Sequence, residues 1–444
     1  MILTRYYIES YFKMDSFLLN LKNNSIIRMK KKEYISLKNG FFSDISKEDI
    51  LLLKNNGFLL IKEEDDFYSV NDLFMREYRV KNKYNKFNIM LTDYCNLACS
   101  YCYMNGEKNQ REMSTGIVDK LVLFIKKVVS FNGDKRIILD YSGGEAFLNF
   151  KVLLYLVNEI REMSLKEGVE IISQNITTNC ALDVSEHVSF LNDNNIKLRT
   201  SLCLYPSDSI SRNFKCGEDS KEYVLNQIKS IIDQGYKFPI EVLWLMPEGE
   251  SSKKDIKDRY MKEFVSKGID ISKVYLKEDC IEISSNYDGF KIKKKDNFSF
   301  SDCKNVISAI KDNEEFDGMF ARWVCCAYRE DFVFTIFPDG KVSNYSGGYQ
   351  QEDFLIGDVD SEIDTMMGKI KEIKENGAWK KDKKCLSCPV LPKCFGGCVC
   401  SFHPHDKNTP SLSCCQKTKI LKNKMIFKQF VKKVCEIETV LGGK

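Results

Sequence analysis

Short apolar segments and amphipathic segments alternate six times between residues 86 and 285. Runs such as Phe87–Leu91 are typical of strands in a buried sheet, and Thr115–Val129 repeats apolar residues at helical spacing. The predicted strands are Phe87–Leu91, Arg136–Asp140, Val169–Asn179, Lys197–Leu204, Ile240–Leu245 and Lys273–Leu276, and the predicted helices are Thr115–Val129, Phe150–Met163, Val184–Asn194, Tyr223–Gln234 and Asp255–Ser266. Six β/α repeats predict an α/β fold whose parallel sheet forms a partial (β/α)6 barrel.

Residues 1–82 contain no cysteine and form a first predicted domain, before a second at 83–285. Ser25–Met29 and Tyr34–Leu37 are expected to be strands. A helix is expected to follow the N-cap Ser46 and to end at Gly57, and Phe58–Ile61 then predicts a strand. This order resembles a small winged-helix-like α+β domain. Two interpretations stay open: a segment that only packs on the next domain, or a module whose strand edge binds a leader peptide.

Residues 286–444 form a third predicted domain, in which cysteines are dense. Phe332–Phe337 is an apolar run, and a Pro-Asp-Gly turn joins it to Lys341–Ser343. This pattern predicts a β-hairpin. Four cysteines with spacings of three, six and four follow it at Cys385, Cys388, Cys394 and Cys398.

Composition narrows the class of protein. The 444 residues carry 67 Lys and Arg against 63 Asp and Glu, a net charge of +4, which argues against a bulk nucleic-acid binder. No run of about 18 apolar residues predicts a membrane span, and the first residues lack the pattern of a signal peptide. In a chain expected to be cytoplasmic, 18 cysteines indicate metal binding rather than disulfides.

Three cysteines at the end of the first barrel strand carry the strongest chemical signal. Cys95, Cys99 and Cys102 lie within eight residues, and a chain of this composition would show such a preset pattern by chance in about 3% of cases. Thiolates are preferred ligands of iron–sulfur clusters. Because four ligands close a cluster, three predict a 4Fe–4S cluster with one iron open to a ligand.

The spacing Cys-x3-Cys-x-aromatic-Cys, with Tyr101 as the aromatic residue, resembles the signature of the radical S-adenosylmethionine (radical SAM) superfamily. The resemblance implies S-adenosylmethionine as cofactor, bound at the open iron. Ser142, Gly143, Gly144 and Glu145, at the end of the second strand, resemble the family motif whose backbone binds the amino group of that cofactor. A plain turn between strand and helix is the alternative reading of these four residues taken alone.

The next two strands carry further positions that the resemblance assigns to the cofactor. Asn179, after the third strand, would contact its methionine or ribose part, and Ser201 lies on the fourth strand. Arg212 could pair with the methionine carboxylate, since a guanidinium suits a carboxylate, or lie on the surface. Cys203 stands where related enzymes usually have aspartate. It either acts on a radical or is a small buried side chain.

The third domain resembles the SPASM extension of radical SAM enzymes, which holds auxiliary 4Fe–4S clusters. By this resemblance one cluster takes Cys385, Cys388, Cys394, and Cys414 or Cys415. A first auxiliary cluster would take ligands from Cys398, Cys325 or Cys326, and Cys303, but Tyr345 stands where the family has its remaining cysteine. That cluster could be three-ligated and open, ligated through Cys400 or the spare cysteine of the vicinal pair, or absent. Structural zinc is the competing interpretation of these cysteines.

The resemblance implies reductive cleavage of S-adenosylmethionine and hydrogen abstraction from a substrate carbon. SPASM-bearing relatives with an N-terminal recognition unit mostly modify ribosomally made peptides, which favours a peptide maturase forming a thioether or other crosslink. The partners would be a precursor peptide with a leader and an electron donor such as flavodoxin or ferredoxin. An anaerobic sulfatase-maturating (formylglycine-forming) enzyme and a non-catalytic iron–sulfur or zinc peptide-binding scaffold are the alternatives.

Overall fold

The computed structural model describes residues 1–62, 64–78, 84–99, 102, 111–204, 211–245, 253–279, 331–344, 354–375, 386, 388, 391–394, 427–432 and 435. They belong to two compact units, and each is described by itself. The first contains the described residues up to 78 and those after 373, and the second contains 84–279 and 331–373. Within the described part of the chain, no helix is long and apolar enough to span a lipid bilayer.

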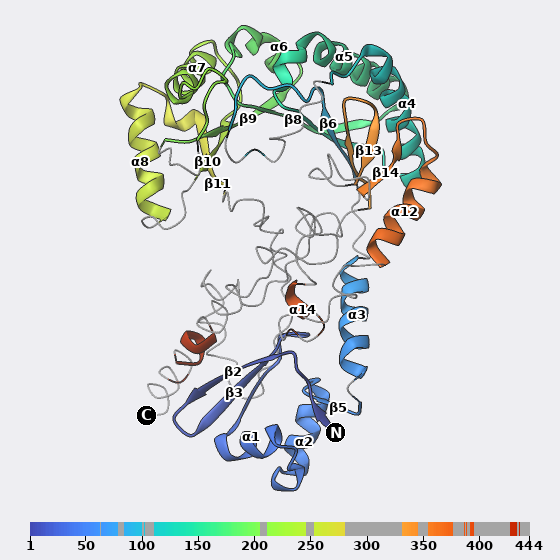
Figure 1. Cartoon of the computed structure of the whole chain (residues 1–444), viewed down its shortest axis with the longest axis vertical. Helices are drawn as coiled ribbons and strands as arrows, with labels where there is room; N and C mark the ends of the chain where they lie inside the picture. Colours follow the sequence, from blue (N-terminus) through green and yellow to red (C-terminus); the bar gives the residue numbers. More distant parts are fainter. Residues whose placement is uncertain are drawn as a thin grey trace. The chain divides into compact units, whose positions relative to one another are not determined.

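In the first unit, two small antiparallel sheets accompany several helices, among them a helical segment at residues 427–432 (Figure 1). One sheet has the order β2-β3-β4, and β1 pairs with β5 in the other. The elements are β1 Ile2–Leu3, β2 Tyr7–Phe12, β3 Asp15–Asn20, β4 Ile26–Lys30, α1 Lys31–Lys38, α2 Lys47–Asn55, β5 Leu59–Leu60, α3 Glu64–Tyr78 and α14 Leu391–Cys394, with a 3-10 turn at Phe42–Asp44. The winged-helix resemblance stays a prediction.

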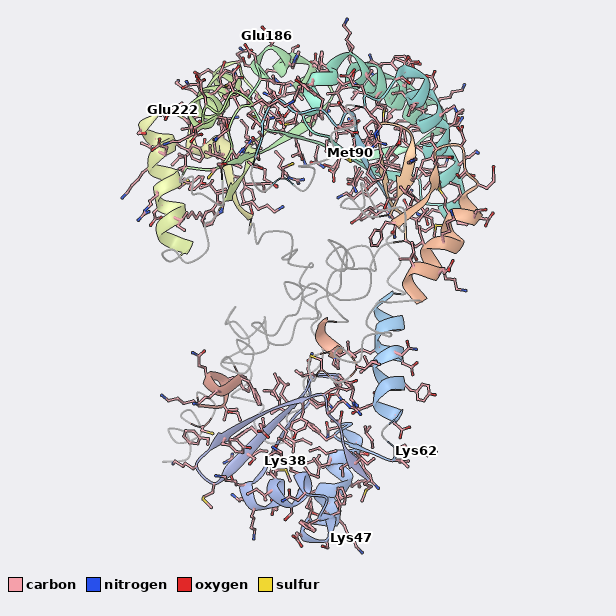
Figure 2. The ribbon with its side chains drawn as sticks, viewed as in Figure 1. Lys38, Lys47, Lys62, Met90, Glu186 and Glu222 are labelled. Carbon is pink, nitrogen blue, oxygen red and sulfur yellow. The ribbon has the colours of Figure 1, made fainter. Side chains whose placement is uncertain are left out.

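One expected strand of this unit is wrong. Tyr34–Leu37 lies inside α1, which ends at Lys38 (Figure 2). Tyr34 and Leu37 are buried and three residues apart, which is helical spacing, and charged residues around them face solvent. The N-cap at Ser46 is confirmed, because its Oγ accepts a hydrogen bond of 3.0 Å from the backbone N–H of Asp49.

The second unit is built on a nine-stranded sheet of order β11-β10-β9-β8-β7-β6-β12-β13-β14. Strands β6 to β11 are parallel neighbours in chain order, which confirms the six β/α repeats. Helices α4 to α8 follow one another in an arc along one side of the sheet (Figure 1). The elements are β6 Asn85–Met90, α4 Thr115–Asn132, β7 Arg136–Ser142, α5 Phe150–Glu167, β8 Glu170–Thr178, α6 Val188–Asp193, β9 Ile196–Leu202, α7 Lys221–Asp233, β10 Ile240–Leu245, α8 Lys253–Ser266 and β11 Val274–Asp279, with 3-10 turns at Ala146–Asn149, Ser185–His187 and Ile271–Lys273.

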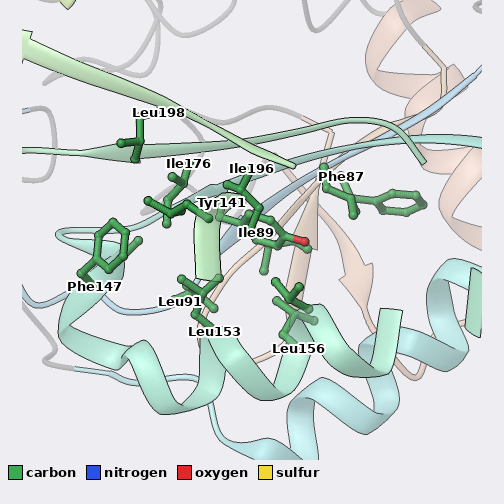
Figure 3. Packing of buried hydrophobic residues seen from close by; sticks show 14 of the residues in the cluster. Phe87, Ile89, Leu91, Tyr141, Phe147, Leu153, Leu156, Ile176, Ile196 and Leu198 are labelled. Carbon is green, nitrogen blue, oxygen red and sulfur yellow. The ribbon is translucent and has the colours of Figure 1, made fainter. Parts of the chain in front are cut away.

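The core of this unit lies between the sheet and its helices. Alternate residues of β7 are buried, and α5 buries Leu153, Leu156 and Ile160 at helical spacing. Figure 3 shows Leu153 and Leu156 on the α5 side of the core, with Tyr141 on the sheet side. Each fully buried side chain of this size contributes about 1.5–3 kcal/mol. This layer fixes the ends of the strands, where the loops begin.

The predicted hairpin is present as β12 Val333–Ile336 and β13 Lys341–Ser343, followed by β14 Leu355–Asp358 and α12 Ile363–Glu375. These strands follow residue 286 in sequence, yet β12 pairs in parallel with β6 and extends the barrel sheet. Phe334 stacks on Phe87 at 5.9 Å between ring centres, and Phe124 of α4 meets its edge at 5.4 Å. Part of the expected third domain therefore completes the core of the second.

Candidate functional site

The predicted site residues meet at the C-terminal edge of the sheet. The cysteine loop, residues 92–111, of which 92–99, 102 and 111 are described, follows β6, and Ser142–Glu145 continues from β7. Asn179 follows β8, Ser201 lies near the end of β9, and Arg212 comes after β9. Because parallel strands present their carboxyl ends at one edge, the sheet gathers loops that are far apart in sequence.

Gly143 and Gly144 allow the cysteine loop to dock backbone against backbone. The N–H of Gly144 donates to Thr92 O at 2.7 Å, and the N–H of Glu145 donates to Tyr94 O at 2.9 Å. A Cβ on Gly143 would lie 2.5 Å from Thr92 O, and one on Gly144 would lie 2.6 Å from Asp93 O. Both positions therefore require glycine. Among the described residues, the backbone that approaches these glycines is the cysteine loop itself.

Glu145 is a buried carboxylate that joins two of these loops. It is 1% exposed, and its oxygens accept hydrogen bonds from the N–H of Phe147 at 3.2 Å and of Asn179 at 2.6 Å. Burial raises the pKa of Glu145, while these hydrogen bonds and the positive charge of Arg212 oppose that shift. Glu145 thus ties the end of β7 to the end of β8.

Asn179 contacts the first cysteine of the triplet directly. Its Nδ2 lies 3.5 Å from Cys95 Sγ and donates to Asn96 Oδ1 at 2.8 Å. Its Oδ1 accepts from the N–H of Ala181 at 2.7 Å, and Asn96 Nδ2 donates to Ala181 O at 2.8 Å. The side chain predicted to contact the cofactor therefore also fixes the turn that carries Cys95.

The three thiols of the triplet are half-buried. Cys95 Sγ accepts from the N–H of Leu97 at 3.4 Å as well as from Asn179. Burial raises the pKa of Cys95, and these donors oppose that shift because they favour the thiolate. N–H donors to ligand sulfur are a normal feature of iron–sulfur sites, so the arrangement fits a cluster.

No group of three His, Cys, Asp or Glu side chains in the described ranges is arranged to hold a single metal ion. Thiolates that bind different irons of one cluster stand farther apart than the ligands of a single ion. The half-buried thiols of the triplet are ligands of the type that an iron–sulfur cluster takes.

A short hairpin after β9, residues 212–219, holds the other side of the cysteine loop, and sequence reasoning missed it. Leu97 and Phe214 form an antiparallel bridge, and the N–H of Ala98 donates to Asn213 O at 2.8 Å. The ammonium of Lys215 lies 3.9 Å from the ring centre of Tyr94. The basic and aromatic residue types are visible in the sequence, but their pairing depends on the barrel.

Arg212 begins this hairpin and is buried, with 3% of its surface exposed. Its Nη2 donates to Asn179 O at 3.1 Å, and its own carbonyl accepts from Ser220, the N-cap of α7, at 2.6 Å. The structure therefore places Arg212 inside the site rather than on the surface. Its pairing with a methionine carboxylate stays a prediction.

The remaining predicted positions fall into three sets: two on or just after β9, two in the first unit, and the rest outside the described residues. Ser201 is half-buried on β9, and Cys203 is buried at 4% exposure, in keeping with the small-side-chain reading. Cys388 is half-buried and Cys394 ends α14, both in the first unit. Tyr101, Tyr345, Cys303, Cys325, Cys326, Cys385, Cys398, Cys400, Cys414 and Cys415 lie outside the described residues. The auxiliary ligand sets stay predictions.

Comparison with known proteins addresses the fold and the cluster. Residues 87–201 match the family described as a 4Fe-4S single cluster domain, which confirms the predicted cluster. The solved structure of native anSMEcpe with bound AdoMet superposes with a TM-score of 0.53 at 17% identity, covering 79% of this chain and 99% of that one. The two proteins therefore share a fold, and the predicted α/β architecture with a parallel sheet is confirmed.

Two further matches are a second solved structure and one curated protein sequence. The structure of anSMEcpe with AdoMet and the Kp18Cys peptide gives the same TM-score of 0.53 at 18% identity, with 80% of this chain and 99% of that chain covered. An uncharacterised protein of Methanocaldococcus jannaschii is 25% identical over 155 residues, which are 35% of this chain. That match spans half of the relative's length.

Proposed function

We propose that the chain is a radical SAM peptide maturase. It binds S-adenosylmethionine and a 4Fe–4S cluster at Cys95, Cys99 and Cys102. It abstracts a hydrogen atom from a ribosomally made peptide and so forms a thioether or another crosslink. We place this activity in the reducing cytoplasm, with flavodoxin or ferredoxin as the electron donor.

One observation carries the proposal. The half-buried Cys95 receives two N–H donors at the C-terminal edge of a radical SAM fold. Asn179, which supplies one of these donors, follows β8, whereas the cysteine loop follows β6. The contact therefore joins two strand ends of the sheet in one site.

The protein's residues bind and orient in this site. Cys95, Cys99 and Cys102 would hold the cluster, and the carbonyls of Ser142–Glu145 would face the amino group of the cofactor, since two of the N–H groups there already bond to the cysteine loop. When bound, the cluster supplies the electron that cleaves S-adenosylmethionine to a hydrogen-abstracting radical. The buried core beneath the strand ends packs against Cys95 and Cys99.

Three features support a peptide substrate. The first unit offers the outer strands β2 and β4, whose edges could pair with an extended leader peptide. Lys31 and Lys32 are exposed directly after β4 and would attract an acidic leader. The fold is shared with a protein solved with a bound peptide. Thioether formation removes two electrons, and an auxiliary cluster at Cys385–Cys415 would accept the one that the radical does not take.

The test is cofactor cleavage by anaerobically reconstituted protein. It should contain at least four irons per chain, bleach with dithionite and release 5′-deoxyadenosine from S-adenosylmethionine. Cys95→Ala should abolish that release. Cys216→Ala is the matched control, because Cys216 is exposed at the tip of the 212–219 hairpin. Full cleavage by Cys95→Ala, or zinc without sulfide in the protein, would refute the proposal.

Sulfatase maturation is a second candidate, favoured by the similarity to anSMEcpe over nearly the whole of that chain. It oxidises one residue of a sulfatase to formylglycine and needs no leader peptide. That match leaves about a fifth of this chain, 100 minus 79%, without a counterpart, which fits an added recognition unit. A peptide with a sulfatase-type Cys motif and a leader-bearing precursor peptide should be compared as substrates. Turnover of only the former would favour sulfatase maturation.

A further inference from the structure

Arg111 closes the base of the cysteine loop. The loop leaves the sheet at Thr92 and returns at Arg111, whose carbonyl accepts from the N–H of Asp93 at 2.9 Å and from Thr92 Oγ1 at 3.1 Å. The next residue, Glu112, forms an antiparallel bridge with Thr92. The two ends of the loop are therefore held together at one point, which we call the loop neck, residues 92, 93, 111 and 112.

The side chain of Arg111 reaches two carboxylates from different parts of the chain. Its Nε donates to Asp93 Oδ2 at 2.8 Å, and its Nη1 pairs with Asp339 Oδ2. Asp93 belongs to the loop neck, and Asp339 lies in the turn between β12 and β13. A planar guanidinium can serve two carboxylates at once, which an ammonium on a flexible stem does less well.

Asp93 depends on this contact. The residue is 2% exposed, and its Oδ1 has no hydrogen-bond partner among the described residues. A buried carboxylate is costly unless a charged partner compensates it. Arg111 is the cation that pairs with it, and the side chain of Arg111 is itself only 27% exposed.

The β12–β13 hairpin touches the cysteine loop at a second place. Phe337, two residues before Asp339, packs on Met90 at the end of β6, and Cys102 lies against this pair. Met90 is labelled in Figure 2. The same hairpin ends one residue before Asn344, next to Tyr345, the position where the SPASM resemblance expects an auxiliary ligand. In sequence, the hairpin is thus adjacent to a position that the resemblance assigns to an auxiliary cluster.

We propose that Arg111 is a positioning residue, which holds the loop neck to the β12–β13 turn by bridging Asp93 and Asp339. The inference rests on the proposed function, since the loop it positions carries the cluster ligands. Movement of the hairpin would then move Cys95–Cys102 relative to the barrel. Arg111 contacts neither the thiols nor the reacting atoms, and its effect passes through the loop neck.

The test compares the single variants Arg111→Met, Arg111→Lys and Asp339→Asn with the double variant that carries both Arg111→Met and Asp339→Asn. Arg136→Met is the matched control, because Arg136 forms an equally close pair with Asp134 at the opposite end of β7. Hydrogen exchange of the apoprotein reports on the loop neck through the amides of Asp93 and Met113, which bond to Arg111 O and Leu91 O. Cluster potential and 5′-deoxyadenosine release are measured after reconstitution.

We expect faster exchange at both amides in Arg111→Met and Asp339→Asn, and slower cofactor cleavage by roughly 10-fold to 100-fold, as for other small misplacements. The double variant should cleave the cofactor as fast as Arg111→Met, because Arg111→Met alone already removes the bridge between Asp93 and Asp339. Arg111→Lys should not restore the wild-type rate. Arg136→Met should leave exchange and cleavage unchanged.

Several results would overturn the inference. A purely electrostatic influence shifts the cluster potential in opposite directions in Arg111→Met and Asp339→Asn, and cleavage rates that follow those opposite shifts contradict positioning. Full rescue by Arg111→Lys, or unchanged exchange in Arg111→Met, contradicts the bridge. If the wild-type protein binds no iron, the proposed function fails, but the exchange experiment on apoprotein still decides whether Arg111 orders the loop.

Discussion

Gly144→Ala tests whether backbone docking places the cysteine loop. An added Cβ would lie 2.6 Å from Asp93 O and 2.5 Å from the carbonyl carbon of Tyr94, and closer still to the oxygen of that carbonyl. These are backbone atoms, which cannot rotate away as a flexible side chain would. Overpacking of this kind costs about 1–3 kcal/mol. The loop must therefore move away from the end of β7.

Movement of the loop also breaks hydrogen bonds. The bonds from Gly144 N–H to Thr92 O, at 2.7 Å, and from Glu145 N–H to Tyr94 O, at 2.9 Å, each contribute about 1 kcal/mol. Together with the steric term, the expected loss is about 3–5 kcal/mol. A displacement of about 1 Å at the cluster would lower the rate of cofactor cleavage by roughly 100-fold.

The assay combines urea unfolding of the apoprotein, iron per chain after reconstitution and the initial rate of 5′-deoxyadenosine release. Gly368→Ala is the control, because Gly368 lies within α12 and an added Cβ there meets nothing within 4 Å. The control should gain about 0.5–1 kcal/mol from lower backbone entropy in the unfolded state. If Gly144→Ala matches Gly368→Ala in all three measurements, the docking argument is wrong.

Three further outcomes follow from named contacts. Asn179→Ala should lower iron retention and shift the cluster potential, because it removes a donor 3.5 Å from Cys95 Sγ, and iron titration with EPR measures both. Phe334→Ala should lower the free energy of unfolding by about 3–5 kcal/mol, measured in urea, since its ring is 0% exposed between two others. Burial raises the pKa of Asp15, but hydrogen bonds and charges from Lys30 and Arg28 lower it by more, so its net shift is downward. Its stabilisation is therefore present above the ordinary aspartate value of 3.8 and lost as the pH falls through its lowered pKa. Asp15→Asn should destabilise the protein at pH 7 and converge with wild type in acid. Equal destabilisation at both pH values would contradict the ion-pair explanation.

The barrel was predictable because its residue pattern is strong and local. Buried residues alternate along β7 and recur at helical spacing along α5, and both elements lie within a few residues of their expected bounds. The strand prediction for Tyr34–Leu37 is wrong because four residues are too few to distinguish a strand period from a helical one. Its membership of α1 becomes clear only from the charged residues on either side.

The supports of the site were less predictable, since they join residues that are distant in sequence. The sequence predicts Asn179 as a cofactor contact, but its hydrogen bond to Asn96 forms only because the ends of β6 and β8 lie close together. The Arg111–Asp339 pair spans 228 residues and requires β12 to lie beside β6. No local pattern indicates such a pairing, because charged residues of both signs are common along the whole chain.

The described residues of the cysteine loop form little regular structure of their own, so their position must come from their neighbours. Four separate segments hold the loop, namely the end of β7 at Gly144, the end of β8 at Asn179, the 212–219 hairpin and the β12–β13 turn at Asp339. Most of these contacts use backbone N–H and C=O groups, so the geometry depends on glycines and strand ends more than on the cysteines. A loop held in this way loses less conformational entropy when a cluster binds. Substitutions at the supports should therefore weaken cluster binding while all three thiols remain in place.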